Sequence, residues 1–217
     1  MRVIACGFVV AGGYMTKTGT SAKKLIVAMT ANKIAREREF DGISVDMICE
    51  LAQISRSSFY RLFRDKYEIL LWCEDLPFQR GIAQMGRTLT CAEGVRVMLE
   101  AFDMFGDLFL STRNSSERIA RETDGGKKAA ALVRETLEEH QQVEIDEELE
   151  FQVKWMVRGL LDVAVAHSKQ EIEGSCAELA QHVRSCAPER LGAILDKPVN
   201  PEAGESLSLA GIILPGL

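Results

Sequence analysis

Residues 43–71 read ISVDMICELAQISRSSFYRLFRDKYEILL and contain two short helical patterns separated by a turn. Ser44 is placed to cap the first helix, because a serine hydroxyl can accept backbone N–H groups that a helix leaves unpaired. Gln53-Ile54 interrupts the first pattern, and Ser55 is placed to cap a second helix. Two short capped helices joined by a tight turn predict a helix-turn-helix. Their apolar sides are formed by Val45, Ile48, Cys49 and Ala52 in the first helix and by Phe59, Leu62 and Phe63 in the second.

The second helix has a polar outer face whose side chains suit DNA. Small hydroxyl groups allow close approach to a groove, the N-terminal amides favour an anion, and arginines can bond guanine edges or phosphates. Ser44 and Ser55 also have a structural role as caps, and Tyr60 can equally pack or contact a phosphate. Nothing in the helix itself requires Arg56 or Arg61. The outer face consists of Arg56, Ser57, Ser58, Tyr60, Arg61 and Arg64, the last of which can be simply a solvated charge.

The segments on either side of this stretch extend the helical pattern. Residues 21–38 contain neither Gly nor Pro, and Phe40-Asp41-Gly42 follows them with turn chemistry. Asp65 is placed to cap a fourth helix that begins with the next residue. From about Lys24 to Leu71, the order and spacing of these elements resemble, without a gap, the TetR family of bacterial transcriptional regulators.

The resemblance implies which side chains meet DNA. The start of the motif's first helix would lie beside a phosphate, and the second helix would face the major groove. Tyr60 would touch the DNA backbone, and Lys66 would contact another phosphate. The residues that the resemblance assigns to DNA are Ser44, Val45, Ser55, Arg56, Ser57, Ser58, Tyr60, Arg61 and Lys66.

Two residues depart from the family's pattern. Glu39 stands where the family often has a glycine before the aromatic residue, and Gln53 stands where the turn often has a glycine. The turn at Gln53 demands a backbone conformation that a residue with a Cβ atom adopts at some cost. Neither departure removes a group that faces DNA.

Beyond Pro77 the pattern changes to longer helices, with neither alternating strands nor a repeat of about 20–50 residues. The sequence therefore predicts an all-α fold. The resemblance divides it into an N-terminal three-helix helix-turn-helix domain that binds DNA and a C-terminal helical bundle that dimerises and binds a ligand. Helices are expected at 78–90, 92–110, 127–142, 146–169 and 175–195, with a break at Pro188 and polar breaks at Ser111–Ser116 and Asp124–Gly126. The expected divisions are an N-terminal extension (1–20), a DNA-binding domain (21–72), an effector-binding and dimerisation domain (73–196) and a loose C-terminal tail (197–217).

The resemblance also implies that the second domain forms a homodimer through its last two long helices and encloses an effector pocket. Gly159, Ala164 and Ala166 would let two helices approach closely, although ordinary packing within one chain would explain them as well. Large side chains on the central helices either belong to the core or line the pocket. In the second case the effector is a small apolar or aromatic molecule. The pocket residues expected are Met98, Phe102, Phe105, Phe109, Phe151, Trp155 and Met156.

The sequence carries no pattern typical of an enzyme, a cofactor site or a metal site. The three histidines are scattered, and there is no His-Glu-x-x-His, Glu-x-x-His, Gly-x-x-x-x-Gly-Lys or Gly-x-Ser-x-Gly motif. The six cysteines form no Cys-x-x-Cys pair and are expected to be reduced, mostly buried thiols of a cytoplasmic protein.

Charge is distributed unevenly along the chain. The formal net charge of the whole sequence is −6, but residues 15–66 carry +4 and residues 67–217 carry −11. A basic head on an acidic body is compatible with DNA contact through one end only.

The first 14 residues form a short apolar stretch behind one arginine. This stretch matches either a signal-peptide core of marginal length or sequence upstream of a functional start at Met15, and the cytoplasmic character of the adjoining helical module favours the second. A helix needs about 20 consecutive apolar residues to cross a bilayer, and no apolar run in this sequence approaches that length.

The sequence therefore predicts a homodimeric transcription regulator that binds double-stranded operator DNA. A repressor that a small molecule releases from its operator is the favoured form. The alternative is a helical protein-interaction module that has lost DNA binding.

Overall fold

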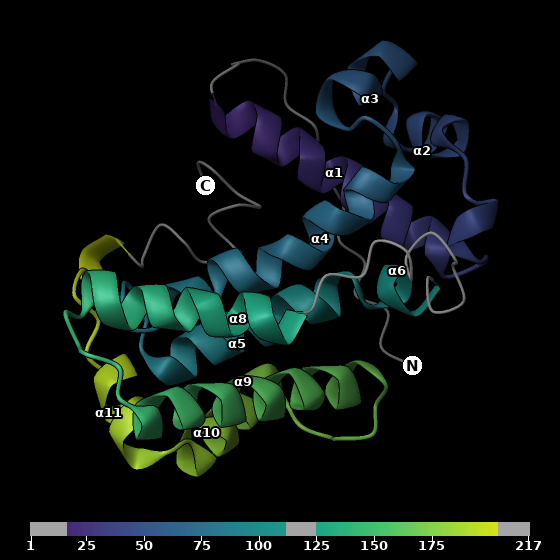
Figure 1. Cartoon of the computed structure of the whole chain (residues 1–217). Coiled ribbons are helices and arrows are strands. Elements are labelled where there is room, and N and C mark those ends of the chain that lie inside the picture. The colour runs from purple at the N-terminus through teal and green to yellow at the C-terminus, as the bar shows by residue number, and fades with distance from the viewer. Residues whose placement is uncertain (1–16, 112–124, 204–217) are drawn as a thin grey trace.

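The computed structural model describes residues 17–111 and 125–203, and these ranges are helical without a β-strand (Figure 1). This confirms the predicted all-α fold. No helix in the described part is long and apolar enough to span a membrane. The α-helices are α1 (Lys17–Ala35), α2 (Val45–Ala52), α3 (Arg56–Leu62), α4 (Lys66–Arg80), α5 (Cys91–Met104), α6 (Gly106–Ser111), α8 (Gly125–Glu135), α9 (Glu147–Ser168), α10 (Cys176–Cys186) and α11 (Glu189–Leu195). Short turns of 3₁₀-helix lie at Phe40–Gly42 and Ile82–Gln84, and a π-helical turn lies at Thr136–His140.

Helices α1 to α3 and the first half of α4 form a compact head at the upper right of Figure 1. The predicted caps are confirmed: the side chains of Ser44, Ser55 and Asp65 accept backbone N–H groups at the starts of α2, α3 and α4. The head has its own apolar core, which α5 and α6 complete from outside. The fully buried rings of that core belong to Phe40, Phe59, Phe63 and Phe105.

Helix α4 runs through Pro77 and ends at Arg80, so the predicted new helix at 78–90 is wrong. The residues after it instead form the 3₁₀ turn and a loop that leads to α5. The close packing of the end of α4 on α5 depends on two glycines, Gly81 and Gly94. A Cβ atom on Gly81 would lie 2.6 Å from the carbonyl oxygen of Gly94 on α5. Without side chains at this crossing, α4 and α5 can pack with their backbones nearly in contact.

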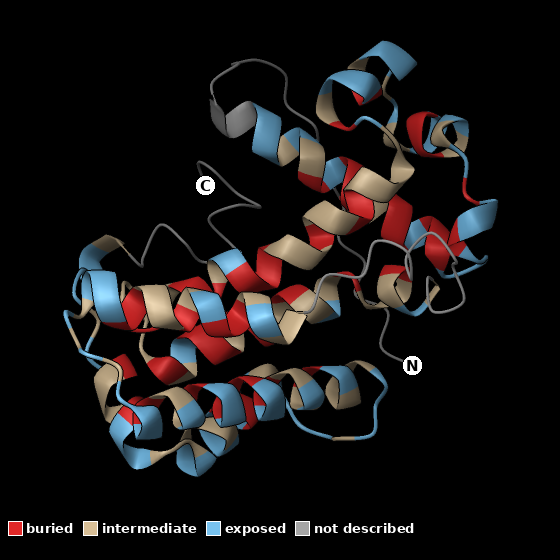
Figure 2. Cartoon of the chain, viewed as in Figure 1, coloured by how far each residue is buried: buried red, intermediate tan, exposed pale blue. Residues whose placement is uncertain are grey.

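The remaining helices form the body of the molecule around α5. Figure 2 shows the buried side of each helix facing its neighbours and the exposed sides facing outward. The predicted helix at 146–169 is confirmed as α9, and Pro188 separates α10 from α11 as expected. The helix expected at 92–110 is divided at Phe105 into α5 and α6, and the one expected at 127–142 ends early in the π-helical turn.

Two of the expected domain edges shift. Residues 17–20 belong to α1 rather than to an N-terminal extension. The described part of the expected loose tail is held against the body, because Val199 and Asn200 donate backbone hydrogen bonds to the carbonyls of Gly86 and Arg87 at 3.2 and 2.8 Å. Residues 1–16, 112–124 and 204–217, with the predictions made for them, lie outside the described residues.

The cysteines in the described part of the chain are free thiols. Cys49, Cys73 and Cys91 are buried, Cys176 is half-buried and Cys186 is exposed.

Candidate DNA-binding interface

The turn between α2 and α3 places the two helices of the motif against each other. Gln53 ends α2 with φ +54° and ψ +43°, the left-handed conformation that the sequence predicts at this position. Its N–H donates to the carbonyl oxygens of Cys49 and Glu50, which closes the last turn of α2. The chain thus leaves α2 sharply and presents α3 on the outside of the head, as Figure 1 shows.

Helix α3 is anchored by one buried ring and is otherwise exposed. Phe59 is fully buried against the rings of Phe63 and Tyr60, whereas Tyr60 itself is 48% exposed. The hydroxyl of Ser55 accepts the N–H of Ser58 and donates to the Ser58 hydroxyl at 3.0 Å, so it holds the start of the helix. The residues left facing solvent include Arg56, Ser57, Tyr60 and Arg61.

The two arginines of α3 have different surroundings. Arg61 is exposed and donates one hydrogen bond to the Ser58 hydroxyl at 3.1 Å. Arg56 reaches across to α2 and pairs with Asp46 at 2.5 Å, and the carboxylate of Asp46 raises the pKa of the Arg56 guanidinium. Both partners of this pair are exposed, so the ion pair is a weak one that a phosphate can replace. Arg61 therefore reaches outward from α3, while Arg56 also links the two helices.

Lys66 has a structural position that the sequence did not reveal. Its ammonium group donates to the carbonyl oxygens of Phe40, Asp41 and Ile43 at 2.9–3.0 Å and lies 5.1 Å from the centre of the Phe40 ring. An ammonium group has three N–H donors, and these contacts occupy all of them. The side chain joins the start of α4 to the turn between α1 and α2, and the phosphate contact expected of Lys66 stays a prediction. Partial burial lowers the pKa of this ammonium group.

Ser44 and Val45 lie at the start of α2. Ser44 is exposed and its hydroxyl accepts the N–H of Met47 at 3.2 Å, and Val45 is half-buried as the first residue of the helix. Both remain predicted neighbours of a phosphate.

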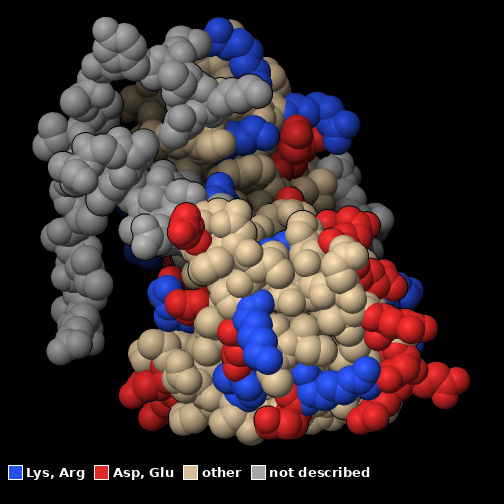
Figure 3. Space-filling model, turned by 90° about the vertical axis from the view of Figure 1, so that its left-hand side faces the viewer, with Lys and Arg blue, Asp and Glu red and all other residues tan. Residues whose placement is uncertain are grey.

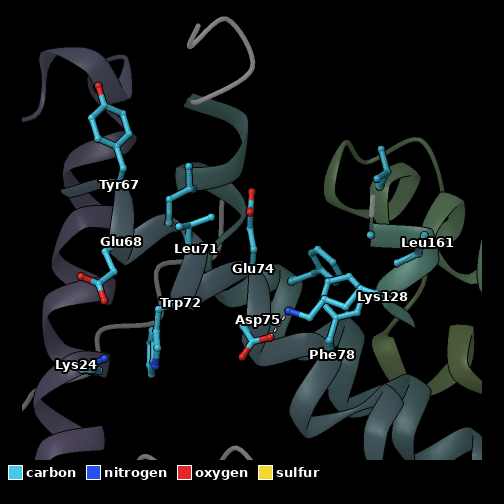
Figure 4. A pocket seen from close by; sticks show the side chains of 14 residues that line it. Lys24, Tyr67, Glu68, Leu71, Trp72, Glu74, Asp75, Phe78, Lys128 and Leu161 are labelled. Atoms are coloured by element: carbon cyan, nitrogen blue, oxygen red, sulfur yellow. Dashed lines mark hydrogen bonds and ion pairs between the residues drawn. The ribbon is translucent and has the colours of Figure 1, made fainter. Parts of the chain in front are cut away.

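A cavity of about 660 Å³ lies between the head and the body (Figure 4). Its walls come from α1, α4, α5, α8 and α9 and combine apolar rings with charged groups. Asp75 on α4 and Lys128 on α8 form an ion pair at its edge, with the Lys128 ammonium 5.3 Å from the centre of the Phe78 ring. The lining includes Tyr67, Leu71, Trp72, Glu74, Asp75, Phe78, Phe102, Lys128, Leu161 and Val165.

Of the expected pocket residues, Phe102 lies in this lining. Met98 and Met156 are buried in the body's core, and Phe105 is buried in the core of the head. Phe109 packs on Phe105 and Phe102. Phe151 and Trp155 are 67% and 51% exposed on α9, away from the cavity. Trp72 and Phe78 also line the cavity, and sequence reasoning missed them because helix periodicity does not separate a ring that faces a cavity from one that faces the core.

A continuous series of ring contacts joins the cavity to α3. Trp72 in the cavity wall contacts Phe63 at 6.2 Å and Phe105 at 6.5 Å between ring centroids. Phe63 in turn contacts Phe59 of α3 at 6.1 Å. Trp72 therefore belongs both to the cavity wall and to the packing around the core that supports α3.

The head and the body differ in surface charge. In Figure 3, Lys and Arg side chains appear at the top of the molecule, where the head lies, and acidic side chains follow one edge of the body. The body's acidic groups include pairs such as Glu150 with Arg134 and Lys154, whose cations lower the pKa of Glu150 to about 2.

Comparisons with known proteins agree with this geometry. The profile of the family described as "Bacterial regulatory proteins, tetR family" matches residues 29–72, which cover the end of α1 and all of α2 and α3. A solved structure named "Dihydroxyacetone kinase operon activator DhaS" is similar over 80% of this chain and 96% of its own, with a TM-score of 0.60 and 15% sequence identity. At that identity the likeness establishes the fold. A search of curated proteins found no match.

Proposed function

We propose that this chain is a DNA-binding transcription regulator of the TetR family, whose profile matches residues 29–72, and that it acts as a homodimeric repressor released from its operator by a small molecule. The observation that carries the proposal is the outer face of α3. Arg61, Ser57 and Tyr60 face solvent on a helix whose inner ring, Phe59, is fully buried. A rigid helix with exposed arginine and hydroxyl groups is suited to enter a major groove.

The proposed dimer uses the exposed face of α9. Phe151 and Trp155 lie one helical turn apart and are 67% and 51% exposed, while Val165 is 46% exposed further along the helix. Gly159 lies between Trp155 and Val165 on this helix. A Cβ atom at Gly159 would meet nothing within 4 Å, so a second helix can approach this point. Large apolar groups in this arrangement favour pairing with another copy. Two copies would place two α3 helices on half-sites about one DNA turn, roughly 34 Å, apart.

The proposed effector site is the cavity between head and body. Trp72, Phe78 and Phe102 favour a small apolar or aromatic molecule, and Glu74 and the Asp75–Lys128 pair can bind a polar group on it. Binding would act on DNA affinity only if the ligand prefers one arrangement of the head over another. The ring contacts from Trp72 through Phe63 to Phe59 supply a packed route for that preference.

The sign of regulation is part of the proposal. Repression is the direction that we propose for this chain, whereas the structurally similar protein is named an operon activator. A reporter gene placed behind the operator separates the two: deletion of the regulator raises expression under repression and lowers it under activation.

The proposal is tested by recovering DNA. The purified chain is incubated with fragments of its own genome at low salt, and the retained fragments are sequenced and then measured in a mobility-shift assay. We expect one or a few fragments with a pseudo-palindromic site. Absence of retained DNA at low salt would support the alternative, a helical interaction module that has lost DNA binding.

The dimer is tested separately by size-exclusion chromatography with light scattering. We expect a mass of two chains for the wild type and of one chain for Trp155→Glu, because a charge would then face the partner's apolar side chains. The matched control is Arg158→Glu, which adds an acid to the same exposed side of α9 without removing an apolar side chain. A monomeric wild type contradicts the dimer without touching the DNA-binding proposal.

A further inference from the structure

Three side chains from different helices meet where α5 ends, α9 ends and α10 begins. They are Asp103 on α5, His167 in the last turn of α9 and Cys176, the first residue of α10. The Asp103 Oδ2 atom lies 3.1 Å from His167 Nε2 and 3.3 Å from Cys176 Sγ, and the sulfur lies 3.8 Å from the same nitrogen. The cluster shares no residue with the effector cavity or with the DNA-binding face.

The triangle formed by these atoms has the size of one face of a zinc tetrahedron. With zinc bond lengths of about 2.0 Å to oxygen, 2.1 Å to nitrogen and 2.3 Å to sulfur, tetrahedral geometry sets the three edges at about 3.3, 3.5 and 3.6 Å. The observed edges differ from these by a few tenths of an ångström. The centre of this triangle, in the plane of the three atoms, is about 2.0 Å from each of them, so an ion slightly above that plane would lie at zinc bond lengths. Each edge also fits a hydrogen bond, the one between Cys176 Sγ and His167 Nε2 being a long contact of 3.8 Å, and together the three contacts bring all three ligand atoms around one point.

The surroundings of His167 match those of a metal ligand. Its second ring nitrogen, Nδ1, lies 3.4 Å from the carbonyl oxygen of Ile172, which directs Nε2 toward Asp103 and Cys176. A histidine that binds a metal through one nitrogen commonly donates the other N–H to a carbonyl or carboxylate. The His167 side chain is 14% exposed, whereas that of Asp103 is 43% exposed, so the cluster is fixed from inside and open to solvent on one side.

We propose that Asp103, His167 and Cys176 form a site for a divalent transition metal, with Zn²⁺ as the preferred ion. Thiolate and imidazole select zinc-like ions over Mg²⁺ and Ca²⁺, which require oxygen ligands. Three protein ligands leave the fourth tetrahedral position to water or to a ligand from solution. The metal would join α5, α9 and α10.

The site is tested with Co²⁺ on tag-free protein under reducing conditions. Cobalt replaces zinc in tetrahedral sites, where a thiolate–cobalt bond gives near-ultraviolet charge-transfer absorption and the coordination gives intense visible bands. We expect one Co²⁺ per chain with both features, and their loss when one equivalent of Zn²⁺ is added. Zinc at about 100 times its Kd should raise the Tm by roughly 5–10 °C.

Each ligand has a variant, and α10 supplies matched controls. Cys176→Ser should abolish the charge-transfer absorption, and His167→Gln and Asp103→Asn should weaken binding at least tenfold and remove the zinc-dependent rise in Tm. Cys186→Ser and His182→Gln change the same residue types on the exposed side of the same helix and should behave as the wild type. Circular dichroism shows whether each variant is folded.

Three results would overturn the site. These are failure of the folded wild type to bind Co²⁺ or Zn²⁺ at micromolar concentration, a thiolate band that persists in Cys176→Ser, and a zinc-dependent Tm rise that persists in folded His167→Gln. None of them depends on DNA binding, so they are independent of the proposed function.

Discussion

The head and the body of this molecule differ in how far apart in the sequence their core residues lie. Among the described residues, the buried core of the head comes mainly from one continuous stretch, Leu25 to Leu76, and is completed by Phe105 and Leu108. The core of the body joins residues from Phe78 to Leu195, and its candidate sites combine helices that are far apart in the chain. The candidate site of the head therefore depends on residues that are close together in the sequence. The candidate sites of the body form only when helices that are far apart in the sequence pack together.

The largest expected effect comes from removing one buried ring from the head, which tests whether the head and the body unfold separately. Phe59→Ala should cost about 3–5 kcal/mol of unfolding free energy, because Phe59 is fully buried between other rings. We expect the head to unfold at lower denaturant than the body. Trp72 fluorescence in a Trp155→Phe background reports on the head, and circular dichroism reports on the whole chain.

The control for this experiment is Leu149→Ala, which removes a fully buried side chain from the body instead. It should shift the circular dichroism transition more than the Trp72 transition. If both variants shift one common transition equally, head and body form a single cooperative unit and the comparison fails.

The next prediction concerns the exposed face of the head. Arg61→Ala should lower operator affinity by about 1–3 kcal/mol, or roughly 5- to 150-fold, if its guanidinium contacts a base edge. The free energy of unfolding should be nearly unchanged, because Arg61 is exposed and bonds only the Ser58 hydroxyl among its described contacts. A mobility-shift titration at fixed salt measures the affinity.

Arg64→Ala is the matched control, because Arg64 lies beyond the last residue of α3 with its Nε atom 3.7 Å from Asp65. It should weaken binding less than Arg61→Ala and equally for all sequences. Unchanged binding by Arg61→Ala would remove this residue from the DNA-reading face.

The sequence predicts the features of the head better than those of the body. Ser44, Ser55 and Asp65 were predictable as caps, and Gln53 as a left-handed turn residue, because these roles depend on neighbours a few positions away. Phe151 and Trp155 could not be separated from buried aromatics, because helix periodicity does not say which face meets the rest of the chain.

The Asp103–His167–Cys176 cluster was invisible to motif analysis for a related reason. Its members are 64 and 9 residues apart and lie on three helices, so no spacing rule connects them. Lys66 shows the converse limit: the position of a lysine in a motif does not reveal that three carbonyl groups already occupy its donors.

Lys66 tests whether a charged group of the head stabilises the fold or contacts DNA. Lys66→Met should cost about 1–3 kcal/mol of unfolding free energy, because three carbonyl groups lose a charged donor. A lysine on a phosphate would instead leave stability unchanged and reduce the slope of log affinity against log salt by about 1. Urea denaturation and mobility shifts at several salt concentrations measure both. Lys23→Met, an exposed change on α1, is the control for charge alone.

The body's ion pairs predict a response to acid. The cations of Arg134 and Lys154 lower the pKa of Glu150 from its ordinary value of 4.5 to about 2, so the pair stabilises the fold above about pH 4.5 and this contribution is lost as the pH falls toward 2. With solvent screening, the loss should be about 1 kcal/mol. Glu150→Gln should flatten the acid limb of the stability profile measured by urea denaturation. An unchanged profile, or the same flattening in the exposed control Glu147→Gln, would contradict this role.

The smallest expected effect compares Gln53 and Glu39, the two positions where the head departs from the pattern of the family that it resembles. Gln53 has φ +54°, a conformation that costs a residue with a Cβ atom free energy but costs glycine little. Glu39 has φ −59° and ψ +145°, which any residue adopts. Gln53→Gly should therefore raise the unfolding free energy by about 0.5–1 kcal/mol, while Glu39→Gly should leave it unchanged or lower it, because glycine adds freedom to the unfolded chain. Equal effects at both positions would show that the left-handed turn stores no strain.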